Sequence, residues 1–294
     1  MSEVKGLGLT PSPIDKRDIL MSSILPPFII PSKFEVKGIT PVRDQGHEGT
    51  CVGFSCAVGM KEWQERDKYV GLSPRYLYEK AKAADSAPDN TPRCTPDGDG
   101  TSIRVAMDIL KKQGVCEESF WKYEACNPGS PQAGADTNAA KYKIKAYANL
   151  DTIKAMQRSL VVNGPFVVGT SVYKNWMDSN VAATGKIPLP GSSEFIGGHA
   201  ICIVGFDDET QLFKFKNSWG TRWGDNGFGY LPYDYRIQAQ AEHFFFEAYS
   251  ATDLIDNVDA LVGAKEKILQ QMGEEFKEGV ELHHWGGDQV IKYH

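Results

Sequence analysis

The stretch of residues 45–55 constrains this chain most, because it predicts a glycine-containing turn that runs directly into a buried helix. The residues after the turn stay apolar, and Trp63 recurs at helical spacing. Thr50 stands before the helix and is expected to cap it through its hydroxyl. Cys51 is then the first helical residue. A thiol at the positive end of a helix dipole has a lowered pKa, which favours the nucleophilic thiolate.

A cysteine on its own is usually a small buried hydrophobe, so a nucleophilic Cys51 needs support from elsewhere in the chain. Gln45 supplies an amide donor just before the cysteine, which can join the backbone N–H of Cys51 in binding an oxyanion. His199 and Asn217 supply an imidazole and a second amide much later in the sequence. Together these residues favour nucleophilic catalysis.

Residues 200–216 predict a β-hairpin that brings His199 and Asn217 together. An apolar run, a polar turn and a strand in which phenylalanine alternates with lysine follow one another. One register places His199 directly opposite Asn217, and a shift by two residues places Trp219 there instead. A shift by one residue would turn both lysines toward the apolar face. Because the imidazole needs an orienting partner, we expect Asn217 to lie opposite His199.

The chain resembles the papain-like cysteine peptidases over roughly residues 40–235. The matching motifs are Pro41-Val42-Arg43-Asp44-Gln45-Gly46, Cys51 with Phe54-Ser55, Gly198-His199-Ala200, and Asn217-Ser218-Trp219-Gly220-Thr221-Arg222-Trp223-Gly224-Asp225-Asn226-Gly227. In that family the histidine follows the cysteine by roughly 130–150 residues, and here His199 follows Cys51 by 148 residues. These motifs together are specific.

The resemblance implies a role for each of these residues. Cys51 would be the nucleophile, His199 the general base and acid, Asn217 the residue that orients the imidazole, and Gln45 the oxyanion donor. Trp219 would shield the His–Asn hydrogen bond from water. The substrate-binding residues are expected to include Gly100, Gly198, Ala200 and Trp219, although a turn role for Gly100 is an equal alternative.

The predicted fold is α+β, with two lobes and a cleft between them. Residues 41–139 are expected to form a mainly helical lobe with helices at 73–82 and 101–112. Residues 140–251 are expected to form a β-barrel-like antiparallel lobe, which carries the His199 hairpin. Its further elements are strands at 141–147 and 165–172 and a helix at 152–163. Such a cleft suits an extended peptide or protein substrate.

Both ends of the chain leave alternatives open. Residues 1–40 are punctuated by proline and glycine, so they predict an extended segment without a long helical pro-region. They would be either a strap packed on the domain or an autoinhibitory segment in the cleft, which would make the protein a zymogen. Residues 252–282 predict an amphipathic helix that either packs on the domain or joins two copies in a homo-oligomer.

Six cysteines in 294 residues fit neither a disulfide scaffold nor a zinc site. Cys51 is expected to be free, and Cys56 and Cys202 to be buried thiols. The disulfide state is left open for the cysteines in loop-like sequence, which are Cys94, Cys116 and Cys126. The resemblance places Cys94 and Cys126 near a disulfide of many secreted members.

Two residues depart from the family motif. Val52 stands where a tryptophan usually follows the nucleophile. Glu48 stands where another family disulfide begins, so that bridge cannot form, which favours a reducing compartment. The carboxylate of Glu48 is also expected near the cleft, where it would disturb the Cys–His ion pair or favour a basic substrate.

Charge and hydropathy exclude several classes of partner. The net charge of −6 argues against a nucleic acid or an anionic membrane as partner. No window approaches the ~18 apolar residues of a spanning helix. The first residues lack the apolar core of a signal peptide, so a cytoplasmic location is favoured unless a leader is missing from the sequence. No metal is expected, because terminal histidines such as His283, His284 and His294 are usually solvated. No cofactor is expected either.

The predicted function is hydrolysis of peptide bonds through a thioester acyl-enzyme on Cys51. One alternative is a catalytically silent binding protein that keeps the lobes and the cleft. Another is a different acyl transfer on the same dyad, such as transamidation or hydrolysis of peptidoglycan amides.

Overall fold

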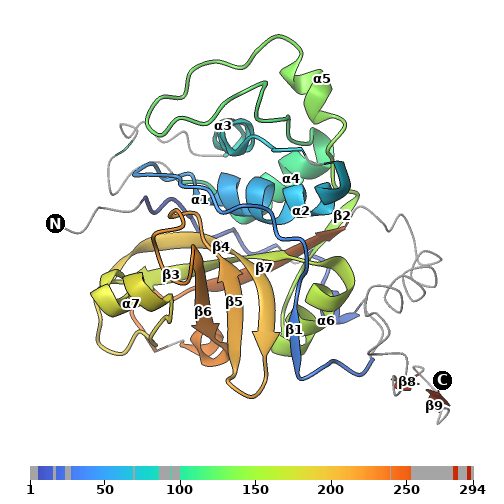
Figure 1. Ribbon diagram of the computed structural model, residues 1–294, viewed down its shortest axis with the longest axis vertical. Coiled ribbons are helices and arrows are strands. Elements are labelled where there is room, and N and C mark those ends of the chain that lie inside the picture. Colours follow the sequence, from blue (N-terminus) through green and yellow to red (C-terminus); the bar gives the residue numbers. More distant parts are fainter. Residues whose placement is uncertain are drawn as a thin grey trace.

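The structure, a computed structural model, describes residues 6–15, 18–23, 28–68, 70–85, 94, 100–238, 240–252, 281–283 and 290–292. Helices α1 to α5 form one lobe of the molecule and an antiparallel sheet forms the other (Figure 1). This is the α+β, two-lobed arrangement expected from the sequence. Among the described residues, none of the helices is long and apolar enough to span a membrane.

The helical lobe is organised around the segment that begins at Cys51. The α-helix α1 (Cys51–Gly53), the π-helix η2 (Phe54–Lys61) and α2 (Glu62–Gln64) follow one another without a break, and almost all of their residues are buried. Gly59 allows this segment to pack directly on the sheet, since a Cβ there would lie 2.5 Å from the Cβ of Cys202.

The two further helices expected in this lobe form, although α4 begins two residues later than expected, and each has a serine whose hydroxyl accepts a backbone N–H. Ser73 caps α3 (Pro74–Ala84) through the N–H of Tyr76, and Ser102 caps α4 (Ile103–Lys112) through the N–H of Val105. The remaining helices of this lobe are η3 (Arg66–Lys68) and α5 (Ala135–Ala139).

Seven strands form one antiparallel sheet in the order β2-β7-β3-β4-β5-β6, and β1 pairs with β4 beside this path. Their bounds are β1 (Lys33–Glu35), β2 (Ala146–Asn149), β3 (Phe166–Tyr173), β4 (Phe195–Asp207), β5 (Leu212–Lys216), β6 (Phe228–Pro232) and β7 (Phe246–Thr252). The helices that accompany the sheet are η1 (Met21–Ser23), α6 (Ile153–Asn163), η4 (Lys174–Met177), α7 (Ser179–Thr184) and η5 (Tyr233–Ile237).

Strand β4 separates two apolar cores, which explains its continuous apolar run. Ala200, Cys202 and Val204 face the cluster of the helical lobe. Ile201 and Ile203 face the cluster inside the β lobe. The strand that carries His199 is therefore held from both sides.

The hairpin of β4 and β5 forms, but its expected register is wrong by two residues. Ile203 pairs with Phe215, and continuing this register places Trp219 opposite His199. A bulge farther along the hairpin shifts the pairing by one more residue. The expectation assumes that the orienting residue must lie directly opposite the imidazole. Asn217 instead reaches His199 from a diagonal position, which is within range for a long side chain.

Lys216 on β5 turns inward, although side-chain alternation predicts that the lysines of this strand face solvent. Its Nζ donates to the carbonyl of Val58 at 2.9 Å and to Oγ1 of Thr40 at 2.8 Å, and its side chain is 4% exposed. Burial lowers the pKa of Lys216 to about 8. Two oxygens from distant parts of the chain thus satisfy the buried amine, so this register is tolerated.

Two other expectations need correction or lie partly outside the described residues. The strand expected from residue 141 begins only at Ala146, because Tyr142 and Ile144 pack into the core of the helical lobe instead. Of the expected helix at 252–282, Thr252 ends β7, and residues 281–282 belong to β8 (Glu281–His283), which pairs with β9 (Val290–Lys292). Residues 253–280 lie outside the described part of the chain.

Candidate active site

The side chains of His199 and Asn217 meet at the end of the β4–β5 hairpin. Nε2 of His199 lies 2.8 Å from Oδ1 of Asn217, and both residues are buried. The ring of Trp219 stacks on the imidazole with 4.6 Å between the centroids and covers this hydrogen bond. The ring of His199 is therefore fixed. Its other nitrogen, Nδ1, has no hydrogen-bond partner among the described residues.

Cys51 lies at the start of α1, with its sulfur facing the backbone of Ala200, the residue that follows this histidine. Its side chain is fully buried, and the backbone N–H groups of Ala200 and Gly8 face its sulfur. Burial raises the pKa of the Cys51 thiol to about 11, although these N–H groups offset part of the effect. Burial lowers the pKa of His199 to about 4, although the hydrogen bond with Asn217 opposes it. Near neutral pH the structure thus holds a thiol and a neutral imidazole, not the expected ion pair.

Gln45 is fully buried, and its side-chain amide is oriented from both ends. Nε2 donates to the carbonyl of Glu48 at 2.9 Å and to the carbonyl of Gly6 at 3.1 Å. Oε1 accepts the hydroxyl of Ser218 at 2.5 Å. The amide donor expected before the cysteine therefore already holds a carbonyl oxygen, which belongs to the N-terminal segment.

The segment of residues 6–12 lies between the two lobes as an extended peptide. On the helical side, the N–H of Thr101 donates to Gly8 and the carbonyl of Thr101 accepts from Thr10. On the sheet side, the N–H of Leu9 donates to the carbonyl of Gly198 at 3.1 Å. Backbone groups of both lobes thus hold this segment as they would hold another extended chain.

The side chain of Leu9 fills a pocket that ends at a carboxyl group. A Cβ added to Gly169 would lie 2.6 Å from Leu9, 2.8 Å from Ile103 and 3.0 Å from Oε1 of Glu247. Leu9 is 7% exposed. Burial raises the pKa of Glu247 to about 7, although the N–H of Ser12 donates to its other oxygen.

The residues expected to bind substrate all lie beside this segment or the imidazole. A Cβ at Gly100 would lie 2.7 Å from the carbonyl of Gly8, and a Cβ at Gly198 would lie 2.3 Å from that of Leu9. Ala200 is buried with its N–H toward Cys51, and Trp219 covers the imidazole. The backbone partner on the helical side is Thr101, which the sequence motif did not single out.

Two expectations for the loop before Cys51 are wrong. The hydroxyl of Thr50 does not cap α1 but lies 2.8 Å from the hydroxyl of Tyr123. The carboxylate of Glu48 does not face the cleft, because it is fully buried and bonded to Arg75. Sequence reasoning missed Tyr123 and Arg75, since neither residue lies in a motif and both come from distant parts of the chain.

The cysteines divide into one disulfide and four buried thiols. Cys94 and Cys126 are joined, with 5.7 Å between their Cα atoms, which is the pairing that the resemblance suggested. Cys51, Cys56, Cys116 and Cys202 are free and buried. Across the described ranges, His, Cys, Asp and Glu form no group of three or more that could hold a metal ion.

The burial of Cys51 predicts slow alkylation as long as the N-terminal segment is in place. We expect iodoacetamide at pH 7 to label Cys51 slowly in the unaltered protein, because a raised pKa leaves little thiolate and Gly8 covers the sulfur. Leu9→Asp should expel the segment, since it would place a second carboxylate beside Glu247. In this variant, called the opened protein below, labelling of Cys51 should be at least about tenfold faster.

Peptide mapping by mass spectrometry measures this difference directly. Cys56, Cys116 and Cys202 serve as internal comparators, because they stay buried in both proteins. Equal rates for Cys51 in the two proteins would contradict the role of residues 6–12 as a cover.

Comparison with known proteins places this site in context. The sequence profile of the papain family cysteine proteases matches residues 30–245. An uncharacterized peptidase C1-like protein of Acanthamoeba polyphaga mimivirus is 28% identical over 288 residues, which covers 87% of this chain and 90% of that protein. Cathepsin J of Rattus norvegicus is 28% identical over 201 residues, and the match covers 65% of this chain and 56% of cathepsin J.

A solved structure matches over nearly its whole length. Xylellain, a cysteine protease from Xylella fastidiosa, superimposes with a TM-score of 0.72 at 26% identity. The superposition covers 87% of this chain and 98% of xylellain.

Proposed function

Because this chain belongs to the papain family of cysteine proteases, we propose that it hydrolyses peptide bonds through a thioester on Cys51. His199 would move the proton, Asn217 would orient the imidazole, and Gln45 would bind the oxyanion together with the N–H of Cys51. The single observation that carries the proposal is the placement of an extended backbone, residues 6–12, against Cys51 and between Thr101 and Gly198.

Acylation begins when a peptide substrate replaces this segment and water reaches the site. The burial that keeps Cys51 and His199 neutral is then reduced, and the thiol proton passes to Nδ1 of His199. The thiolate attacks the scissile carbonyl carbon, and the electron pair moves to the carbonyl oxygen. Gln45 Nε2 and the N–H of Cys51 stabilise the resulting oxyanion. When the C–N bond breaks, His199 protonates the leaving amine and a thioester remains.

Deacylation uses the same residues with water in place of the amine. His199 takes a proton from the water, and the oxygen attacks the thioester carbonyl. Collapse of the second oxyanion breaks the C–S bond, which releases the acid and returns the thiolate. The hydrogen bond between His199 and Asn217 keeps the ring in one orientation through both steps.

We also propose that the N-terminal extension has two parts with different roles. Residues 6–12 would be inhibitory: Gln45 holds the carbonyl of Gly6, while the thiol faces the N–H of Gly8. The carbonyl that Gln45 holds thus belongs to a different residue from the N–H that faces the sulfur. Because the oxyanion donor and the nucleophile do not meet at one carbonyl group, the segment would resist cleavage. Residues 28–40 would be a structural strap, since Phe28 is buried and β1 pairs with β4.

The domain division at residues 139 and 140 and an oligomer through residues 252–282 stay predictions. The proposed substrate is a peptide or a protein, in keeping with the family, with no nucleic acid or membrane as partner.

Cleavage in water enriched in the isotope ¹⁸O tests this function against its alternatives. We expect the opened protein to convert a peptide library into pairs of fragments, each with a new amine and a new carboxyl group that carries ¹⁸O. Cys51→Ala should prevent this, and Cys56→Ala, which alters a buried thiol in the adjoining helix η2, should not. Mass spectrometry of the products is the readout.

Other outcomes would identify the alternatives. Intact peptides that co-purify with the protein would indicate a binding protein. Peptides joined through new amides and free of ¹⁸O would indicate transamidation. Cleavage restricted to peptidoglycan fragments would indicate an amidase.

A further inference from the structure

The loop of residues 45–50 carries Gln45 and ends at Cys51, so its shape determines where both proposed oxyanion donors lie. The carbonyl of Glu48 is the internal anchor of this loop, because it accepts Nε2 of Gln45 at 2.9 Å and the N–H of Thr50 at 2.8 Å. A movement of Glu48 would therefore move both ends of the loop.

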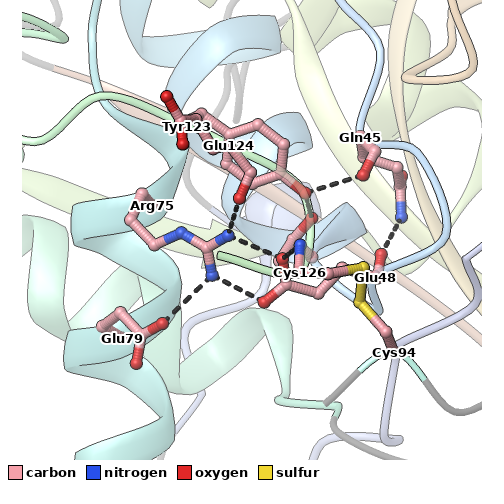
Figure 2. The surroundings of a disulfide bond; sticks show 9 residues. Gln45, Glu48, Arg75, Glu79, Cys94, Tyr123, Glu124 and Cys126 are labelled. Atoms are coloured by element: carbon pink, nitrogen blue, oxygen red, sulfur yellow. Dashed lines mark hydrogen bonds and ion pairs between the residues drawn. A yellow bond between two sulfur atoms is a disulfide. The ribbon is translucent and has the colours of Figure 1, made fainter. Parts of the chain in front are cut away.

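The side chain of Glu48 leaves the cleft and enters a fully buried ion pair (Figure 2). Its two oxygens accept the two terminal nitrogens of Arg75, each at 2.6 Å. One of them also accepts the N–H of Cys126 at 2.9 Å. This bidentate geometry fixes the direction of the carboxylate as well as its distance from α3.

Arg75 is held independently of Glu48, so it can act as a fixed support. It is fully buried on α3, where Glu79 and the carbonyl of Glu124 accept from its terminal nitrogens at 3.1 and 2.7 Å. The ring of Tyr123 lies over the guanidinium at 4.7 Å. The hydroxyl of Tyr123 donates to the carbonyl of Gln45 at 2.7 Å, which gives a second link from this support to the loop.

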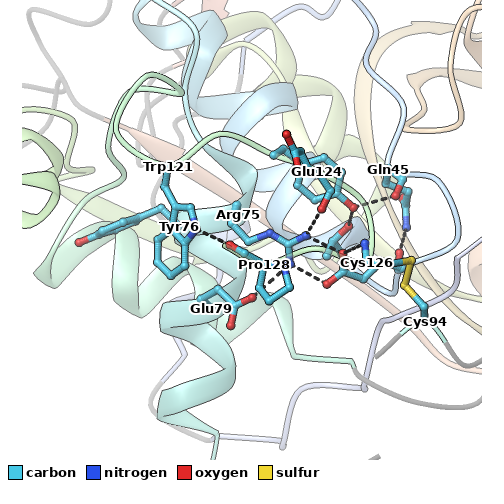
Figure 3. A network of polar contacts seen from close by, with 12 residues as sticks. Gln45, Arg75, Tyr76, Glu79, Cys94, Trp121, Glu124, Cys126 and Pro128 are labelled. Carbon is cyan, nitrogen blue, oxygen red and sulfur yellow. Dashed lines mark hydrogen bonds and ion pairs between the residues drawn. A yellow bond between two sulfur atoms is a disulfide. The ribbon is translucent and has the colours of Figure 1, made fainter. Parts of the chain in front are cut away.

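The segment that carries Tyr123 and Cys126 is itself tied down (Figure 3). Nε1 of Trp121 donates to the carbonyl of Pro128 at 2.6 Å, which closes the segment on itself. The disulfide joins Cys126 to Cys94. The contacts thus run without interruption from α3 and this segment to the amide of Gln45.

We infer that Glu48 and Arg75 are positioning residues for Gln45, the side-chain oxyanion donor of this enzyme. Their ion pair holds the loop of residues 45–50 against α3 and the segment 121–128, so that Gln45 Nε2 is aimed before substrate arrives. Preorganised donors are effective because they need no rearrangement during the reaction. This inference rests on the proposed function, since it assigns the pair a task within that reaction.

A double-mutant cycle in the opened, full-length protein tests the inference. Glu48→Gln should lower kcat about 10- to 100-fold and should change KM less than about threefold. The loss of kcat is smaller than the loss caused by removing an oxyanion donor outright, because the donor is misdirected and not absent. In a Gln45→Ala background the same substitution should lower kcat by less than about threefold, because the donor it positions is already gone. The alkylation rate of Cys51 should stay within about twofold, because alkylation forms no oxyanion.

Glu79→Gln is the matched control, because Glu79 binds the same guanidinium from the side away from Gln45 (Figure 2). It should leave kcat within about twofold. Tyr123→Phe is a milder second variant that removes only the hydroxyl link to Gln45, and its loss of kcat should also vanish in the Gln45→Ala background.

Three results would overturn the inference. Equal losses of kcat from Glu48→Gln with and without Gln45 would show that the pair acts elsewhere. A loss of thiol alkylation parallel to the loss of kcat would show a merely structural role. If Glu48→Gln does not fold, the Tyr123→Phe cycle decides: equal losses of kcat with and without Gln45 would overturn the inference. Absence of turnover in the opened parent protein would instead overturn the proposed function, and this inference with it.

Discussion

Leu9→Asp is expected to raise kcat/KM for peptide substrates at least about 100-fold. Burial of a leucine side chain contributes about 2 kcal/mol, and a carboxylate forced into the same pocket without a partner would cost several more. Glu247 lies within the pocket and, in its ionised form, would repel the new carboxylate. Each ~1.4 kcal/mol changes the ratio of filled to open cleft about tenfold, so the filled state should be lost. Progress curves with a fluorogenic peptide measure the gain.

The controls for this prediction come from the same N-terminal extension. Ile14 is 98% exposed, so Ile14→Asp introduces the same charge without disturbing the pocket and should leave kcat/KM unchanged. Deletion of residues 1–12 should reproduce the gain, while residues 28–40 must stay, because they contribute β1 and the buried Phe28. A synthetic peptide of residues 1–12 should inhibit the opened protein.

Two results would argue against autoinhibition. An unaltered protein as active as the opened one would show that residues 6–12 leave the cleft readily. An inactive opened protein whose Cys51 is alkylated rapidly would separate access to the thiol from turnover, and the fault would then lie in the proposed chemistry.

Local signals predicted most of the elements that carry the site. Caps and apolar periodicity located α3, α4 and α6, because the information for each lies within a few residues of its ends. The register of β4 and β5 could not be predicted in this way. The expected and observed registers differ by two residues and keep the same faces, and in the observed one Asn217 reaches His199 from a diagonal position.

The motifs predicted candidate site residues but not their protonation state. The contact between His199 and Asn217 is present as expected. Burial shifts the pKa values of Cys51 and His199 in the direction opposite to the expected one. The expectation relied on the helix dipole and on a Cys–His ion pair, and both assume a solvated cleft. The structure shows instead that residues 6–12 lie against Cys51, Gln45 and Gly198. The role of Glu48 was equally hidden, since its partner Arg75 belongs to no motif.

Gln45→Ala is expected to lower kcat of the opened protein about 100- to 1,000-fold, which is the usual cost of removing one oxyanion donor. KM should change little, because the donor acts mainly on charge that develops in the transition state. Steady-state kinetics with one fluorogenic peptide separate the two quantities. Gln45→Glu should be as damaging, since it keeps an acceptor for the hydroxyl of Ser218 but loses the donor.

The loss of kcat should come from the missing N–H donor of Gln45 and not from a change in the packing around this residue. Ser218→Ala keeps Nε2 of Gln45 and removes only the hydroxyl that orients the amide, so we expect a loss of about tenfold, roughly the effect of one misdirected hydrogen bond. Cys51 should be alkylated at the same rate in all three variants, because the thiol and His199 are untouched. If alkylation slowed together with kcat, Gln45 would be supporting the loop that holds Cys51, and the oxyanion role would be wrong.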